Sequence, residues 1–242
     1  MNNIAAMKAL WKQAFGDTDK FIDGFFSTSF LSDRCHCLYD GDKLTAALYW
    51  MKALQNRKPV AYIYAVATDE AYRGQGLCRR LMTETHEILK QQGYVGAVVV
   101  PATAELFSLY EKLGYQTFCY MDSHEIPAGD PIEITPSDPV TNHMARTNML
   151  DGNAVIQSGG LDFLLTYNDF YEAQDCVFCA ALEGETVYFQ EFLGDRSKLP
   201  GVIAAMGGKT GKVRLPGNAP FAMFHPLTTD ATLPTYFNMP MD

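Results

Sequence analysis

Hydrophobic and polar positions follow two periods along the first half of the chain. Apolar residues recur every three to four positions in some stretches, which predicts helices, and alternate with polar residues in others, which predicts strands. In chain order the pattern predicts helix, helix, strand, strand, strand, helix, strand, helix, strand. These elements span residues 4–15, 18–26, 35–39, 43–52, 61–68, 77–92, 94–100, 103–114 and 115–125. The order favours an α/β fold with a mixed sheet.

The pattern changes at four prolines between residues 127 and 139. Prolines interrupt both helices and strands, so a linker is predicted over 127–142, between a domain of residues 1–126 and a smaller α+β domain of residues 143–242. The second half is predicted to contain a strand, a helix, a hairpin, a helix and two strands. They span residues 154–157 and 161–173, a turn at 183–184, a helix from about residue 199, and strands at 213–215 and 221–225.

Composition narrows the classes of protein to consider. Hydrophobic residues make up 48% of the 242 positions and charged residues 19%, as in folded domains. The net charge of −9 argues against a nucleic-acid partner and is compatible with a cationic acceptor. No apolar run is long enough to cross a membrane, and the first residues do not resemble a signal peptide. A cytoplasmic location is therefore expected.

The six cysteines form two short motifs. Cys35 and Cys37 flank a histidine, and Cys176 and Cys179 form a C-x-x-C. Zinc sites usually present paired motifs on turns, whereas both motifs here lie in predicted strands. We therefore expect structural cysteines in a reducing compartment, and no metal.

The most distinctive stretch is the junction between the predicted strand 61–68 and the helix that begins at residue 77. Gly74 and Gly76 precede that helix, and Arg73, Arg79 and Arg80 lie around them. Glycines allow backbone amides to point into a concavity at a helix N-terminus, where the helix dipole favours a phosphate. The junction predicts a site for a phosphate-bearing cofactor.

Two known phosphate motifs do not fit. A dinucleotide fingerprint would require glycine where Arg79 stands. The sequence Gly208-Lys209-Thr210 has Ile203 where a P-loop needs its first glycine, and it follows a predicted helix instead of a strand.

The spacing that does fit is R-x-x-G-x-[G/A], at Arg73, Gly76 and Cys78, with Cys78 departing from the usual glycine or alanine. A second run, Leu-Tyr-Glu-Lys-Leu-Gly-Tyr at residues 109–115, follows in the expected order. In both runs the chain resembles the GNAT acetyltransferase superfamily. The resemblance covers the first half; the element order of the second half is similar to a degenerate GNAT-like half without a coenzyme site, or to an unrelated α+β cover.

The resemblance implies transfer of an acetyl group from acetyl-CoA, as co-substrate, to a small-molecule or peptide amine. The implied cofactor-binding residues are Val66, Ala67, Arg73, Gly74, Gln75, Gly76, Leu77, Cys78 and Thr103. Thr103 stands where many members have asparagine, and it can also be the cap of its helix. Tyr110 matches the motif tyrosine that acts as general acid, because a phenol stays protonated at neutral pH; its helical spacing also suits a core residue.

Several alternatives stay open. Tyr62 and Tyr64 can line an acceptor pocket or pack in the core, and the five histidines lie outside any motif. Some two-domain relatives use the C-terminal carboxylate as the base, which would be that of Asp242. A non-catalytic acyl-CoA sensor and an aminoacyl-transferring relative are the rival functions. The acceptor, the general base and the oligomeric state do not follow from the sequence.

Overall fold

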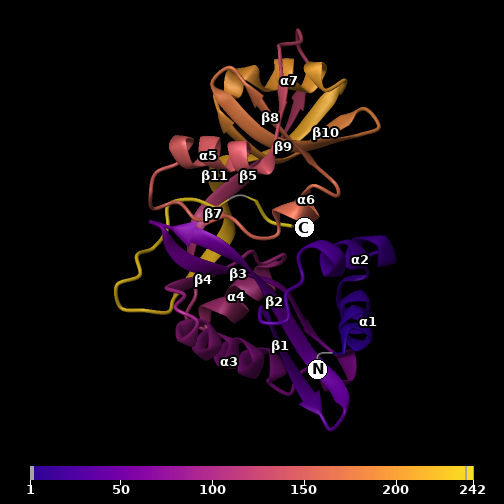
Figure 1. The fold of residues 1–242 in the computed structure, drawn as a ribbon, viewed down its shortest axis with the longest axis vertical. Coiled ribbons are helices and arrows are strands. Elements are labelled where there is room, and N and C mark those ends of the chain that lie inside the picture. The colour runs from indigo at the N-terminus through magenta and orange to yellow at the C-terminus, as the bar shows by residue number, and fades with distance from the viewer. Residues whose placement is uncertain (1–2, 238, 242) are drawn as a thin grey trace. The chain divides into compact units, whose positions relative to one another are not determined.

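The computed structural model describes residues 3–237 and 239–241, and Figure 1 shows their course. Contacts divide the chain into two compact units that interleave along the sequence. Unit 1 contains residues 3–116, Gln157–Phe163 and Met223–Leu233. Unit 2 contains Thr117–Ile156, Leu164–Ala222 and the described residues from Pro234 onward. The predicted division at residues 127–142 into independent domains stays a prediction.

Unit 1 is built on a mixed sheet. Its helices are α1 (Ile4–Phe15), α2 (Asp19–Thr28), α3 (Leu77–Gln91) and α4 (Ala104–Glu111), with a 3₁₀ turn η1 (Glu70–Tyr72). Its strands are β1 (Cys35–Asp40), β2 (Lys43–Gln55), β3 (Lys58–Thr68), β4 (Gly96–Val99) and the last residues of β11 (Thr210–Pro226). In that order the strands are neighbours, and all pairs are antiparallel except β3 with β4. The elements predicted for residues 4–68 and 77–114 are confirmed to within a few residues.

In unit 1, side chains of successive strand residues pack on opposite faces of the sheet. On one face, Leu48 and Trp50 of β2 lie in a buried cluster with Leu81 of α3. On the other, Tyr49 packs against Trp11 of α1, with ring centroids 5.3 Å apart. Because successive side chains of a strand point to opposite sides, α3 and α1 cover opposite faces of the sheet.

Local signals explain where the first helices begin and end. The side chain of Asn3 accepts a hydrogen bond from the Ala6 amide at 3.1 Å and caps α1, which stops at Gly16 with φ of 75°. Of the two predicted caps of α2, Thr18 takes the role and accepts from the Phe21 amide at 3.2 Å. Asp17 instead accepts from the indole of Trp11 at 2.7 Å.

Unit 2 contains the remaining strands of the sheet and a core of its own. Its strands are β5 (Gln116–Pro127), β6 (Thr135–Ser137), β8 (Asp169–Ala173), β9 (Cys176–Glu183), β10 (Thr186–Gly194) and most of β11. Its helices are α5 (Pro139–Met149) and α7 (Leu199–Ala205), with a 3₁₀ turn η2 (Arg196–Lys198). The strand order is β11-β10-β9-β8-β6, and β5 pairs with β11. Strand β7 (Ile156–Gln157) and helix α6 (Leu161–Leu164) lie where the chain crosses between the units.

The predicted helix over 161–173 is wrong. Only α6 is helical, and Asp169–Ala173 forms β8, paired with β9. The apolar residues of this stretch fit the helical period as well as the strand period, and its second part becomes a strand because it pairs with β9.

The predicted strands 213–215 and 221–225 are one continuous strand, β11. Pro216 and Gly217 indicate a break in the sequence. In the structure, the carboxylate of Asp122 accepts hydrogen bonds from the amides of Asn218 and Ala219 at 3.1 and 3.0 Å. A side chain from β5 thus satisfies backbone groups at the irregular point.

Helix α5 begins inside the predicted linker. Asp138 accepts from the amides of Val140 and Thr141 at 2.9 and 3.1 Å, and Pro139 occupies the first turn. Proline is compatible with this position because its missing N–H would have no helical partner. The proline that suggested a linker is therefore part of a helix start.

Candidate active site

The candidate site begins where two parallel strands of unit 1 separate. β3 and β4 pair through Val60–Gly96, Ala61–Ala97 and Tyr62–Val98. β3 continues to Thr68 beyond this ladder. After Tyr62, the edge of β3 that faces β4 therefore has no β4 residue paired with it.

A β-bulge lies in this part of β3. Between two regular β2–β3 pairs, Leu48 stands opposite two residues, Ala65 and Val66. Ala65 has a left-handed backbone with φ of 49°, which costs a residue with a side chain about 1–3 kcal/mol. Bulges interrupt the regular ladder and re-aim nearby groups. The backbone of Val66 and Ala67 follows directly after this interruption.

The loop after β3 ends at the N-terminus of α3. Gly74 and Gly76 have φ of 75° and 78°, and a Cβ at either position would meet no described atom within 4 Å. Gly76 is the N-cap of α3, and among the described residues no side chain hydrogen-bonds to the amides of its first turn. These amides and the positive end of the helix dipole are therefore uncapped and open, as the binding of an anion at a helix N-terminus requires.

Cations surround this helix start. Arg73, Arg79 and Arg80 are all exposed. Arg80 also donates to the carboxylate of Glu84 at 2.7 Å. Positive side chains at a helix N-terminus repel the dipole, and a bound anion would offset that repulsion.

The structure brings Tyr110 of α4 close to this loop. Tyr110 is 6% exposed, and Cys78 packs against the same buried cluster. Burial raises the pKa of Tyr110 well above its ordinary value of 10, and the thiol of Cys78 raises it further. The phenol therefore holds its proton at neutral pH.

A buried group of rings lies beside Tyr110. The Tyr115 ring is 5.5 Å from that of Tyr110, and its hydroxyl is hydrogen-bonded to His86 Nε2 at 2.9 Å. His86 stacks on His225 at 4.2 Å. Burial lowers the pKa of His86 to about 3, helped by His225 and Lys90, so both rings are neutral at pH 7.

Thr103 holds the N-cap position of α4, as predicted, but its side chain caps no amide of that helix among the described residues. The hydroxyl contacts Glu105 instead. The pKa of Glu105 is lowered first by its own backbone amide and then by this hydroxyl.

The two tyrosines on the other face of β3 belong to an aromatic cluster. Tyr62 is 2% exposed, and its ring centroid is 5.9 Å from that of Tyr64. The Tyr64 ring in turn packs 5.4 Å from Trp11 and 5.7 Å from Phe25. Both rings thus pack within unit 1; because Tyr64 is only half-buried, a role of these tyrosines in an acceptor pocket stays a prediction.

The predicted role of the C-terminal carboxylate falls on Asp242, which lies outside the described residues. The segment before it is held in unit 2. Phe237 and Met241 are buried, and the thiol of Cys119 donates to the Phe237 carbonyl at 3.2 Å.

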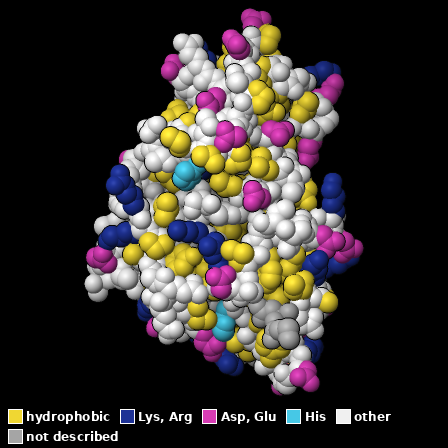
Figure 2. Space-filling view, in the orientation of Figure 1, with side chains coloured by type: hydrophobic (Ala, Val, Ile, Leu, Met, Phe, Trp, Pro, Cys, Tyr) yellow, Lys and Arg dark blue, Asp and Glu magenta, His cyan; other side chains and the backbone are white. Residues whose placement is uncertain are grey.

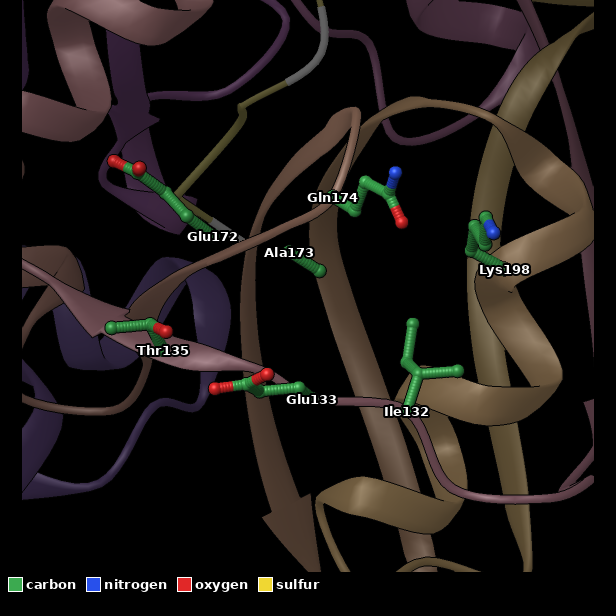
Figure 3. Close-up of a pocket in the computed structure, with 7 residues that line it drawn as sticks. All are labelled: Ile132, Glu133, Thr135, Glu172, Ala173, Gln174 and Lys198. Atoms are coloured by element: carbon green, nitrogen blue, oxygen red, sulfur yellow. The ribbon is translucent and has the colours of Figure 1, made fainter.

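A cavity of about 430 Å³ lies in unit 2, and Figure 3 shows its lining. The lining residues are Ile132, Glu133, Thr135, Glu172, Ala173, Gln174 and Lys198. None of them is a predicted site residue. Glu172 also accepts a hydrogen bond from Ser137 at 2.7 Å, which gives its carboxylate a structural partner.

On the face of the molecule in Figure 2, hydrophobic side chains lie exposed among acidic and basic ones. Within residues 3–237 and 239–241, no cluster of three or more His, Cys, Asp and Glu side chains is arranged to hold a metal ion. No helix of the described chain is long and apolar enough to span a membrane.

Comparison with known proteins identifies the first half of the chain. Residues 2–118 match the family model of the acetyltransferase (GNAT) domain. These residues form a GNAT acetyltransferase domain. An uncharacterized N-acetyltransferase of Schizosaccharomyces pombe is 27% identical over 116 residues, which are 48% of each protein. The chain thus spans about half the length of this curated relative.

The likeness to solved structures extends beyond residues 2–118 and covers most of the chain. A GCN5-related N-acetyltransferase from Kribbella flavida has a TM-score of 0.69 and 16% identity, over 91% of this chain and 68% of that one. A second, from Anabaena variabilis, has a TM-score of 0.67 and 15% identity, over 93% and 71%. An acetyltransferase structure from Pyrococcus horikoshii has 0.65 and 11%, over 98% and 90%. At these identities the likeness shows a shared fold, which extends into unit 2.

Sequence reasoning did not predict two features near the candidate site: the β-bulge at Ala65 and the stacked pair His86–His225. The bulge at Ala65 carries no glycine or proline to mark it. His86 and His225 lie far apart in the chain, and only the pairing of β4 with β11 brings the second ring to the first.

Proposed function

We propose that the GNAT domain binds acetyl-CoA at the Arg73–Cys78 loop and transfers its acetyl group to a primary amine. The observation that carries the proposal is the open, uncapped N-terminus of α3 beside a buried tyrosine. Family membership supports the same reaction. The amine acceptor is a small molecule or a peptide.

The loop residues fit the phosphate groups of such a co-substrate. Backbone amides of Arg73, Gly74, Gln75, Gly76, Leu77 and Cys78 would hold the pyrophosphate, because the glycines leave the space beside the loop open. Val66 and Ala67 would offer backbone groups to the acyl end, because the bulge disturbs the ladder there. Thr103, exposed at the start of α4, would contribute its hydroxyl.

Acetyl-CoA supplies an activated acetyl group in the form of a thioester. Fixed backbone donors after Ala65 would stabilise negative charge that develops on the acyl oxygen. Tyr110 Oη would act as general acid, since its phenol carries a proton at neutral pH. The ring of Tyr115 packs against Tyr110 and would keep it in place.

The test is a steady-state assay of thiol release with a panel of primary amines. Tyr110→Phe removes one hydroxyl and keeps the packed ring, so kcat is expected to fall about 10²- to 10⁴-fold. KM for acetyl-CoA should change little. Tyr120→Phe is the matched control, because Tyr120 is 44% exposed.

A rival function, a non-catalytic acyl-CoA sensor, predicts another result. Wild-type protein would then bind acetyl-CoA and release no thiol with any amine. Equal kcat for wild type and Tyr110→Phe would instead show an enzyme in which Tyr110 is a packing residue.

A further inference from the structure

The cavity of about 430 Å³ in unit 2 lies outside the site described above, and all of its lining residues belong to that unit. Volumes of this size are typical of small-molecule sites. A round cavity of this volume would be about 9 Å across, roughly the length of two to three extended residues. The cavity can therefore hold a molecule of the size of a short peptide.

Part of the lining is apolar and firmly supported. Ile132 and Ala173 line the cavity and pack against the buried cluster of unit 2. The same cluster contains Leu199, which is fully buried and directly follows Lys198 of the lining. Figure 3 shows Ile132, Ala173, Gln174 and Lys198 around an open space. Apolar side chains of a ligand would find contact surface here.

The charged side chains of the lining lie on two sides of this space. In Figure 3, Glu133 and Glu172 are on the left and Lys198 is on the right. Lys198 is half-buried and Glu133 is exposed. Neither the ammonium of Lys198 nor the carboxylate of Glu133 forms an ion pair with another described residue. Both charges are therefore available to a ligand.

Asp195 is an acidic neighbour of Lys198, but it has another partner. Its carboxylate accepts a hydrogen bond from the Ser197 amide at 2.9 Å and caps the 3₁₀ turn η2. The pKa of Asp195 is lowered first by its bonds to Ser197 and only then by the charge of Lys198. Asp195 thus supports the turn that carries Lys198.

Glu172 is held in place by the pairing of β6 with β8. It stands opposite Thr135 in that ladder, and its Oε1 accepts a hydrogen bond from the Ser137 hydroxyl at 2.7 Å. Its Oε2 makes no hydrogen bond with a described residue. An ionised carboxylate accepts several hydrogen bonds, so Glu172 can also bind an ammonium group.

We propose that this cavity binds a short peptide with free ends, its ammonium at Glu133 and Glu172 and its carboxylate at Lys198. Apolar side chains of the peptide pack on Ile132 and Ala173. A simple amine would leave Lys198 unpaired, and a simple carboxylate would leave the two glutamates unpaired. A zwitterion satisfies both sides, and the opposite charges fix its direction in the cavity.

Titration calorimetry with the dipeptide Leu-Leu tests the proposal on the intact protein. No acetyl-CoA is present, so the result is independent of the proposed acetyl transfer. Wild type should bind Leu-Leu about tenfold or more tightly than Leu-Leu amide, which lacks the carboxylate. The same difference is expected for N-acetyl-Leu-Leu, which lacks the ammonium, because each change removes a hydrogen bond between charged groups.

Variants assign each end of the peptide to its side of the cavity. Lys198→Gln should lower the affinity for Leu-Leu about tenfold and leave that for Leu-Leu amide unchanged. The double variant Glu133→Gln with Glu172→Gln should also bind Leu-Leu more weakly, but should bind N-acetyl-Leu-Leu as wild type does. Glutamine keeps an acceptor for Ser137. Lys209→Gln is the control, because Lys209 is an exposed cation of unit 2 outside the lining.

Three results would overturn the proposal. One is no binding of Leu-Leu by wild type at millimolar concentration. Another is Leu-Leu amide that binds as tightly as Leu-Leu, which would indicate an amine site without a role for the carboxylate. The third is wild-type affinity for Leu-Leu in a Lys198→Gln protein whose circular dichroism shows that it is folded.

Discussion

The stacked His86–His225 pair predicts that acid destabilises the GNAT domain. His86 has an ordinary pKa of 6.5 and a folded-state pKa of about 3, because burial and His225 disfavour its charged form. The unfolded chain therefore binds a proton that the folded chain does not, and stability falls as pH drops from about 6.5 towards 3. One such group contributes about 1.4 kcal/mol per pH unit. Between about pH 6.5 and pH 4.5 the expected loss is of order 3 kcal/mol. The pKa of His225 is lowered too and adds in the same direction.

Urea unfolding at about pH 7, 5.5 and 4.5 measures this slope. His86→Gln keeps a polar side chain near Tyr115 without a titrating group, so the slope should fall by about 1.4 kcal/mol per unit. His124→Gln is the control, since His124 is exposed on β5. A His86→Gln slope equal to that of wild type would show that His86 is not held neutral, and the reasoning from burial would be refuted.

The other stability predictions concern buried contacts. Glu191→Gln should cost about 3–5 kcal/mol in urea unfolding, because Arg146 is ion-paired to Glu191 in unit 2 with only 3% and 2% of the side chains exposed. The double variant Arg146→Met with Glu191→Leu should regain most of that stability. A urea midpoint of Glu191→Gln equal to that of wild type would contradict the predicted cost of breaking the ion pair. Gly96→Ala places a Cβ 2.1 Å from the Phe224 ring and should lower stability by about 1–3 kcal/mol. Adding Phe224→Leu should restore part of it, and an unchanged melting temperature for Gly96→Ala would count against the packing of β4 on β11.

Most of the GNAT domain could be predicted because its signals are local. Gly16 and Gly93 mark helix ends by their own backbone conformation, and Thr18 caps the helix that follows it by accepting from the amide three residues later. The Arg73–Cys78 loop is contiguous, so a short motif describes all of it. The fold and the loop follow from short stretches of sequence, whereas the role of each residue there stays a prediction.

The rest depends on partners that are distant in the chain. β8 is a strand because β9 lies beside it, and β11 continues past Pro216 because Asp122 satisfies its backbone. The bulge at Ala65 results from the register between β2 and β3. Apolar periodicity within a single segment carries no information on these pairings.

Titration calorimetry with acetyl-CoA tests the central proposal, a cofactor site at the N-terminus of α3. Three proteins are compared: wild type, Gly76→Trp and Gly41→Trp. Gly41 also has a positive φ and open space beside it, but it lies in the β1–β2 turn. Wild type and Gly41→Trp should bind, and at 100 times Kd the ligand should stabilise each by about 2.7 kcal/mol. Gly76→Trp should stay folded and lose binding. Binding by folded Gly76→Trp with wild-type affinity, or no binding by wild type, would contradict the proposed site.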